Sequence, residues 1–275
     1  MKNIIAVNTN CYHGFSLNEA LEGIAAAGFH YVELTAVRGW TEHVMPDMSK
    51  EQLEAVKQKM ESLDIQAISL SGHCNLMEEE RLEDFERNIE LASYFGCKYI
   101  ITSTGEAHFG KGEVFADDVL VKNIKRILPK LEEHKITMVL EVHGQYGTGE
   151  SLYHITKAVD SPYVAVNYDT ANVVFYGGKY PEQEIKSCVQ GVKYVHLKDK
   201  DGDMKDWNFP AVGSGKLKLA EFMEYMDSVS YSGPYSIEIE YTEDFCMRDK
   251  VAGDLKVANQ AMKDSYCYLK SIHRI

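Results

Sequence analysis

The stretch VLEVHG at residues 139–144 is an apolar run that ends in a carboxylate, an imidazole and a glycine. Such a run is typical of a buried β-strand that delivers polar side chains to the loop after it. Glu141 and His143 are two residues apart, so their side chains share one face of the strand. A buried carboxylate needs a compensating partner, such as an arginine or a metal ion. The rest of the chain therefore has to supply that partner.

Seven further strand-like stretches alternate with helical patterns along the chain. The eight predicted strands lie at residues 4–8, 31–34, 67–70, 99–102, 138–142, 164–168, 194–197 and 235–240. The predicted helices lie at 16–28, 49–62, 79–95, 116–134, 149–159, 182–190, 217–228 and 251–272. The first helix opens with a capping box at Ser16 and Glu19 and ends at Gly28. Eight alternating units predict an α/β fold with a parallel sheet, closed as a (β/α)₈ TIM barrel. An open doubly wound sheet is the alternative.

Length and composition support one globular barrel. The 275 residues contain no Pro- or Ser-rich linker, so residues 1–275 are predicted to form a single TIM-barrel domain. No apolar run reaches the roughly 20 residues of a membrane span, and the first apolar stretch is too short for a signal peptide. Six scattered cysteines without a CxxC pair indicate a reduced, cytoplasmic protein. A net charge of −13 argues against nucleic acid as a partner.

One acid or histidine arrives at the end of each of the last four predicted strands. These residues are Glu141, Asp169, His196 and Glu238, with Glu240 as a competitor for the last place. Because the ends of parallel barrel strands meet at one rim, we expect the four side chains to converge. Three carboxylates and one imidazole favour a single divalent ion, with Mn²⁺ expected and Co²⁺, Mg²⁺ or Zn²⁺ as alternatives. The competing interpretation is four separate polar groups, each satisfied by its own neighbours.

Four short motifs add a resemblance to a known family. They are LExH at 140–143, DTxN at 169–172, HLKD at 196–199 and IExE at 237–240. Together with the barrel count, they resemble the xylose-isomerase-like superfamily of sugar phosphate isomerases and epimerases over essentially the whole chain. This superfamily is related to ketose 3-epimerases, inosose dehydratases and type IV abasic-site endonucleases. The resemblance implies that the four strand-end residues, with Glu238 as the last, bind the metal.

The resemblance also implies a reaction on a small-molecule sugar. In the ketose 3-epimerases the two metal-binding glutamates act as acid and base on opposite faces of the sugar, which casts Glu141 and Glu238 in these roles. A metal-polarised ketone loses its α-proton to give an enediolate, so we expect an isomerase or epimerase of a keto sugar or sugar phosphate. The alternative is a lyase, either an inosose-type dehydratase or a 3-keto-C-glycoside deglycosidase with His143 as base. A non-catalytic sugar-binding protein or partner subunit is the alternative from another class, and the family also allows a homo-oligomer.

Two positions depart from the family pattern. The epimerases place a histidine three residues after the metal-binding aspartate, where this chain has Asn172. They also use an arginine after the HLKD-type histidine, where this chain offers Lys198 and Lys200; these lysines are expected either to hold substrate oxygens or to lie in solvent. The extra histidines of the endonucleases are missing, which together with the negative charge argues against DNA repair.

Other candidate substrate contacts lie in the loops after the early strands. His73 follows the third predicted strand, and His108 follows the fourth in a glycine-flanked loop. Trp40 follows the second strand and is expected either to stack on a sugar face or to plug the barrel mouth. The glycine pair in VGSGK at residues 212–216 suggests either a phosphate site or a tight loop before a helix.

Overall fold

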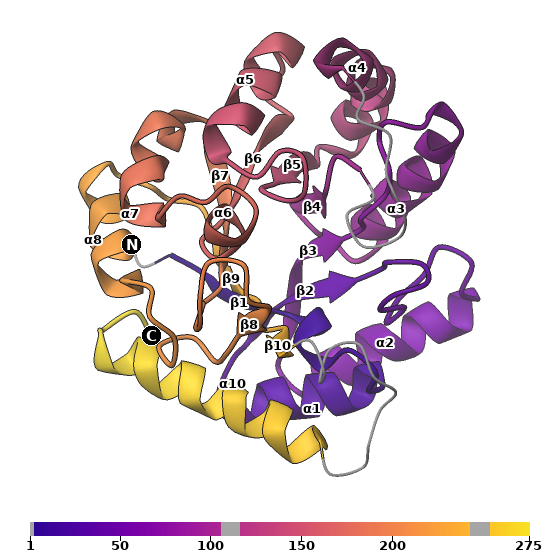
Figure 1. Ribbon diagram of the computed structural model, residues 1–275. Coiled ribbons are helices and arrows are strands. Elements are labelled where there is room, and N and C mark those ends of the chain that lie inside the picture. The colour runs from indigo at the N-terminus through magenta and orange to yellow at the C-terminus, as the bar shows by residue number, and fades with distance from the viewer. Residues whose placement is uncertain (1–2, 106–115, 243–253) are drawn as a thin grey trace.

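A computed structural model describes residues 3–105, 116–242 and 254–275, and its centre is a closed barrel of eight parallel strands (Figure 1). The strands are β1 (Ile5–Asn8), β2 (Tyr31–Thr35), β3 (Gln66–Ser71), β4 (Tyr99–Thr102), β5 (Thr137–Glu141), β6 (Val164–Asp169), β7 (Val192–Leu197) and β9 (Tyr235–Ile237). Each strand pairs with the next, and β9 closes the barrel against β1. The predicted (β/α)₈ barrel is therefore confirmed.

Helices surround this barrel on the outside (Figure 1). The longer ones are α1 (Leu17–Ala27), α2 (Lys50–Ser62), α3 (Leu82–Tyr94), α4 (Asp117–His134), α5 (Gly149–Val159), α8 (Leu219–Ser228) and α10 (Asp254–Ser271). Short 3₁₀ turns are η1 (Thr9–Tyr12) and η2 (Glu79–Arg81). The predicted capping box of α1 is present at Ser16 and Glu19, and Gly28 ends that helix at φ 105°. None of the described helices is long and apolar enough to cross a membrane.

The structure differs from the sequence prediction in two segments. The helix predicted over 182–190 is broken into α7 (Pro181–Glu184), η3 (Ile185–Ser187) and η4 (Val189–Gly191), and a short α6 (Asn172–Phe175) precedes it. The strand predicted over 235–240 stops at Ile237. The chain then turns away because β10 (Tyr241–Thr242) pairs antiparallel with β8 (Asn208–Phe209), outside the barrel.

The barrel interior has an apolar part and a polar part. Ile101, Val139, Ala165 and Tyr194 form a small buried cluster inside the strands. Buried polar residues gather where the strands end, whereas most of the apolar core lies between the strands and the helices. The polar side chains at the strand ends therefore form a site that lies next to the buried apolar side chains of the barrel interior. The five described cysteines are free.

His43, in the loop after β2, is expected to make stability depend on pH. Its ring is 8% exposed, and Nε2 donates to the carbonyl oxygen of Phe15 at 3.0 Å. Burial lowers the pKa of His43 to about 4, against about 6.5 for an unfolded chain. A depressed folded pKa contributes stability that is present above pH 6.5 and lost as the pH falls toward 4. The resulting decrease in the free energy of unfolding should reach about 3 kcal/mol.

Urea unfolding at a series of pH values measures this contribution. The His43→Gln variant should show a shallower decline between pH 6.5 and 4 than the wild type, because it has no ring to protonate. His30→Gln is the control, since that ring is exposed at the surface. Equal slopes for wild type and His43→Gln would contradict the prediction.

Candidate metal centre and its cavity

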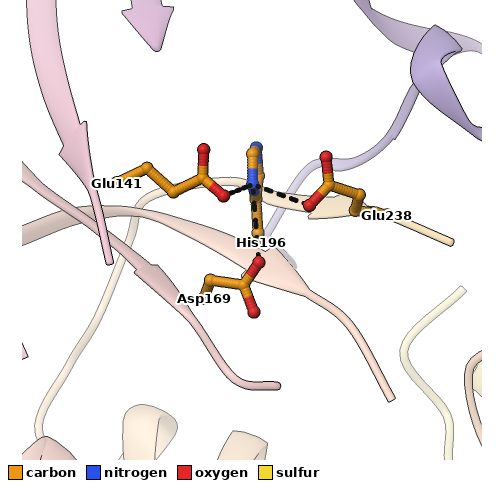
Figure 2. Close-up of side chains that lie close together, drawn as sticks. All are labelled: Glu141, Asp169, His196 and Glu238. Carbon is orange, nitrogen blue, oxygen red and sulfur yellow. Dashed lines mark ion pairs between the residues drawn. The ribbon is translucent and has the colours of Figure 1, made fainter. Parts of the chain in front are cut away.

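Four buried side chains from the second half of the barrel converge at one point (Figure 2). Glu141 ends β5, Asp169 ends β6, His196 lies in β7, and Glu238 directly follows β9. Each offers one ligand atom, and these atoms all lie within 4.8 Å of one another. The strand ends therefore bring together the four residues that the sequence proposed. Glu240 is not part of this cluster.

The imidazole of His196 stands at the centre of the cluster (Figure 2). Its Nδ1 lies 3.5 Å from Oε1 of Glu141, 3.4 Å from Oε2 of Glu238 and 3.9 Å from Oδ2 of Asp169. Nδ1 makes no hydrogen bond to any described residue, although it is buried. An imidazole nitrogen aimed at three carboxylates in this way is in position to serve as a ligand.

The other ring nitrogen of His196 is held by Glu33, a residue that the sequence analysis missed. Nε2 of His196 lies 3.1 Å from both carboxylate oxygens of Glu33. Asn8 and Tyr194 also donate to this fully buried carboxylate, at 3.0 and 2.8 Å. Bonding at Nε2 directs Nδ1 to the cluster, as a carboxylate behind a ligating histidine does. The available signal was YVELT at residues 31–35, a second apolar strand ending near a glutamate.

The two oxygens of Asp169 have different surroundings. Oδ1 accepts from the backbone N–H groups of Ala171 and Asn172 at 2.8 and 2.7 Å. Oδ2 faces the cluster and has no hydrogen-bond donor among the described residues. The side-chain amide of Asn172 donates to Oε1 of Glu141 at 3.1 Å. The turn after β6 thus fixes two carboxylates and leaves Oδ2 of Asp169 directed at the centre.

Lys198 is buried beside the cluster and supplies a fixed positive charge. Its Nζ lies 3.1 Å from Oε2 of Glu238 and 3.8 Å from Oδ2 of Asp169, and it pairs closely with Oε2 of Glu240. Only 1% of the residue is exposed. The interpretation of Lys198 as a solvated loop lysine is therefore wrong, because the end of β7 points it inward. Lys200 is also buried, and it donates to backbone carbonyls of Asp201 and Asp203.

Negative charge dominates the electrostatics of the cluster. Burial raises the pKa of Asp169 to about 8, since Lys198 only partly opposes it and the neighbouring glutamates add to it. Burial also disfavours the charged form of Glu238, but Lys198 and His196 outweigh burial and lower its pKa to about 2. The imbalance is visible in the residues themselves, because five buried carboxylates (Glu33, Glu141, Asp169, Glu238 and Glu240) meet one ammonium and two imidazoles (Lys198, His196 and His73).

The cluster fits a divalent cation. Two buried ligand atoms, Nδ1 of His196 and Oδ2 of Asp169, lack hydrogen bonds to described residues and face the same point. A cation there would offset the surplus of carboxylates. Carboxylate oxygens with one imidazole suit Mn²⁺, Mg²⁺, Co²⁺ or Zn²⁺.

A cavity of about 90 Å³ opens onto the cluster. Its lining includes Glu141 and Glu238 together with the predicted substrate contacts His73, Trp40, His143, Asn172 and Lys198. Glu240 lines it too. His108 lies outside the described residues. The cavity therefore brings these candidate substrate contacts together in one space beside the four ligand atoms.

Three histidine and tryptophan side chains in this cavity have defined partners. Nε2 of His73 lies 3.1 Å from Oε2 of Glu141, and the backbone N–H of Ser103 donates to its Nδ1 at 3.0 Å. Nε2 of His143 lies 3.2 Å from the hydroxyl of Tyr176, another residue not foreseen from sequence. Trp40 stacks on His13 with ring centroids 4.1 Å apart. One face of the indole is thus already covered by a neighbouring ring.

Comparison with known protein families assigns the chain to one of them. The family model described as xylose isomerase-like TIM barrel matches residues 21–265. The chain belongs to this family. A comparison with curated protein sequences found no match. The resemblance read from the four motifs is confirmed at the level of the superfamily.

Solved structures of xylose isomerase-like and related barrels share the fold over nearly the whole chain. A D-psicose 3-epimerase from Clostridium cellulolyticum H10, solved with D-tagatose, has a TM-score of 0.78 at 14% identity, covering 99% of each chain. A D-allulose 3-epimerase from Methylomonas sp., in complex with D-allulose, has a TM-score of 0.74 at 16% identity and covers 98% of this chain and 97% of that one. A Mycobacterium smegmatis xylose isomerase-like TIM barrel protein in complex with magnesium has a TM-score of 0.72 at 16% identity, covering 97% and 98%. At these identities, the likeness shows the fold.

The glycine pair at residues 212–216 serves a loop of this xylose isomerase-like barrel. The carboxylate of Asp199 accepts hydrogen bonds from the backbone N–H groups of Gly213 and Gly215 at 2.9 Å and of Leu217 at 3.2 Å. These amides are already used, so the phosphate interpretation of this segment is wrong. Lys216 pairs with Asp201 at 2.9 Å. The tight-loop alternative is the one that the structure supports.

Proposed function

We propose that this protein is a divalent-metal-dependent isomerase or epimerase that acts on a keto sugar through an enediolate. The observation that carries the proposal is the convergence of Glu141, Asp169, His196 and Glu238 at the floor of a cavity. The epimerase structures with D-tagatose and D-allulose support a ketose as the substrate class. The match over residues 21–265 also supports a single domain spanning the chain.

The arrangement of the two glutamates suits proton transfer on both faces of a sugar. A bound divalent metal would polarise the substrate carbonyl and favour loss of the neighbouring proton. Glu141 and Glu238 approach the centre from opposite sides (Figure 2). We assign one carboxylate to remove the proton from the α-carbon and the other to return a proton to the opposite face. His73, Asn172 and Lys198 line the same cavity and are proposed to hold substrate oxygens.

The surroundings of Glu141 and Glu238 support these roles. Burial disfavours charge on Glu141, but His196 and His73 outweigh it and lower its pKa well below the usual value. Glu238 accepts from Asn8 at 3.0 Å through Oε1, which fixes the carboxylate while Oε2 faces the centre. Both carboxylates are therefore oriented, and their charged form suits the removal of a proton; the carboxylate that returns a proton has to take one up first. We propose Mn²⁺ as the metal, since carboxylate-rich sets suit it, with Mg²⁺, Co²⁺ and Zn²⁺ as alternatives.

One observation favours a lyase as the second candidate. His143 lines the cavity, and its Nε2 lies 3.2 Å from the hydroxyl of Tyr176. A histidine paired with a tyrosine beside the metal centre offers a third group that can take a proton. With His143 as base, the same enediolate would expel a leaving group from the β-carbon, as a dehydratase or a 3-keto-C-glycoside deglycosidase requires.

The test combines metal content with isotope exchange. We expect purified protein to bind one divalent ion per chain, measured by elemental analysis after dialysis. Ketoses incubated with the Mn²⁺-loaded protein in heavy water should gain carbon-bound deuterium if the protein is an isomerase or epimerase. An enone or a released leaving group would instead identify a lyase. Binding without exchange or elimination would identify a sugar-binding protein and overturn the proposal, as would the absence of stoichiometric metal.

A further inference from the structure

The ammonium group of Lys198 is enclosed in the wall of the metal-centre cavity. Its Nζ donates to Oε2 of Glu238 at 3.1 Å, to Oδ1 of Asn172 at 3.4 Å and to Oε2 of Glu240. An ammonium group has three N–H donors, so these three oxygens account for all of them. The ring of Phe209 adds to the enclosure, because its centroid lies 4.4 Å from Nζ. Lys198 is thus an internal cation with fixed neighbours.

The backbone of Lys198 is held by the neighbouring strand end. Its N–H donates to Oγ1 of Thr170 at 3.0 Å, and the hydroxyl of Thr170 donates to its carbonyl oxygen at 2.6 Å. Thr170 directly follows Asp169 in the chain, so one turn positions both the lysine and a carboxylate of the cluster. Only 2% of the lysine side chain is exposed, so solvent ions screen its charge little.

Lys198 approaches two of the oxygens that the candidate ligands direct at the centre. Oε2 of Glu238 lies 3.1 Å from Nζ and 3.4 Å from Nδ1 of His196. Oδ2 of Asp169 lies 3.8 Å from Nζ and 3.9 Å from the same Nδ1. A divalent ion held by the cluster would need these oxygens and would be repelled by the ammonium. Glu240 pairs with the ammonium from outside the cluster, so it can keep this partner when an ion binds.

We propose that the ammonium group of Lys198 competes with the divalent ion for Oε2 of Glu238 and Oδ2 of Asp169, and that it takes the place of the ion's charge in the metal-free protein. The inference rests on the proposed function, because it concerns the same metal centre. Without an ion, the ammonium offsets part of the repulsion among the buried carboxylates. An incoming ion has to replace a charge-assisted hydrogen bond and accept a positive neighbour, which lowers its affinity.

The competition has a consequence for the order in which the centre is filled. An ion that takes Oε2 of Glu238 frees one N–H donor of Lys198, which is then available to a substrate oxygen in the cavity. The ion therefore prepares the cavity wall for the sugar. Because the empty centre is already partly neutralised, the metal is held as an exchangeable cofactor.

Calorimetric titration of Mn²⁺ into the dialysed, metal-free protein measures the competition. Lys198→Met should bind Mn²⁺ about tenfold to a hundredfold more tightly than the wild type, the equivalent of one charge-assisted hydrogen bond. Lys198→Arg retains the positive charge and should show no such gain. Lys200→Met is the matched control, because its ammonium is also removed from a buried residue but donates to the backbone carbonyls of Asp201 and Asp203. Its Mn²⁺ affinity should equal that of the wild type.

Urea unfolding with and without saturating Mn²⁺ gives a second measurement. The decrease in stability caused by Lys198→Met in the metal-free protein should be smaller in the Mn²⁺-bound protein, since the ion then supplies the positive charge. If Lys198→Met does not fold without metal, Lys198→Gln takes its place in both measurements, because its amide can still donate to Glu240.

The outcomes for this inference and for the proposed function are distinguishable. Equal or weaker Mn²⁺ binding by Lys198→Met would overturn the competition while leaving the proposed metal centre intact. An equally large gain in Lys198→Arg or Lys200→Met would overturn it as well. Binding by Lys198→Met but not by the wild type would support the competition and overturn the proposed function. If neither protein binds Mn²⁺, both are wrong.

Discussion

Replacing Glu141 or Glu238 by glutamine is expected to lower the rate of epimerisation about 10²–10⁴-fold through the loss of proton transfer alone. Glutamine keeps an oxygen that can face a metal but cannot accept the α-proton. Measurements at saturating Mn²⁺ therefore isolate this effect from weaker metal binding. Because the two carboxylates face each other across His196, each variant should lose transfer on one face only.

Isotope exchange distinguishes the two variants. In heavy water, the variant that keeps the proton-removing carboxylate should still exchange the α-proton of the substrate for deuterium, but it should not form the epimer. The other should neither exchange nor epimerise. Glu240→Gln is the comparison, since Glu240 lines the cavity but lies outside the cluster, and it should retain the metal. If both Glu141→Gln and Glu238→Gln epimerise at the wild-type rate when loaded with metal, the assignment is wrong.

Replacing Lys198 by methionine is expected to lower the free energy of unfolding of the metal-free protein by about 3–5 kcal/mol. Methionine has a similar length but no charge, so Glu238 and Glu240 would lose the ammonium that both contact. Removing one partner of a buried ion pair leaves uncompensated charge in the interior, and that accounts for the size of the loss. Urea unfolding followed by circular dichroism measures it.

Two comparisons test the cause of that loss. Lys200→Met should lower the free energy of unfolding by less than Lys198→Met does. The ammonium of Lys200 donates to the backbone carbonyls of Asp201 and Asp203, so its removal leaves no buried carboxylate without its partner. Adding Glu240→Gln to Lys198→Met should restore part of the stability, because it removes one of the stranded carboxylates. Equal losses for the two lysine variants, with no recovery in the double variant, would contradict this explanation.

The barrel and the four cluster residues could be predicted because both follow from local pattern. Alternating strand and helix signals determine a parallel barrel, and its geometry places every strand end at one rim. Glu141, Asp169 and His196 therefore converge without any knowledge of side-chain contacts. The prediction of one helix over 182–190 was wrong because the apolar spacing there is also compatible with successive short turns. Only some of the residues in α7 and the following 3₁₀ turns are buried.

The remaining features depend on contacts between distant parts of the chain. Lys198 resembles any lysine in a polar loop, and its burial follows from carboxylates 40 and 42 residues away along the chain. The role of Asp199 depends on amides that lie 14 to 18 residues further on. Arg38 and Arg81 reach one space because β2 and β3 are neighbours, which no single motif records. Pairing partners of this kind are set by tertiary structure.

Glu33 ties the metal centre to the first half of the chain. The four candidate ligands all belong to the segment from β5 onward, yet the imidazole among them is held by a carboxylate on β2. Asn8 of β1 extends this tie, because its amide donates to both Glu33 and Glu238. A half-barrel that began at β5 would contain every ligand and still lack the groups that orient two of them. The orientation of these two ligands is thus a property of the closed barrel, in which β9 pairs with β1.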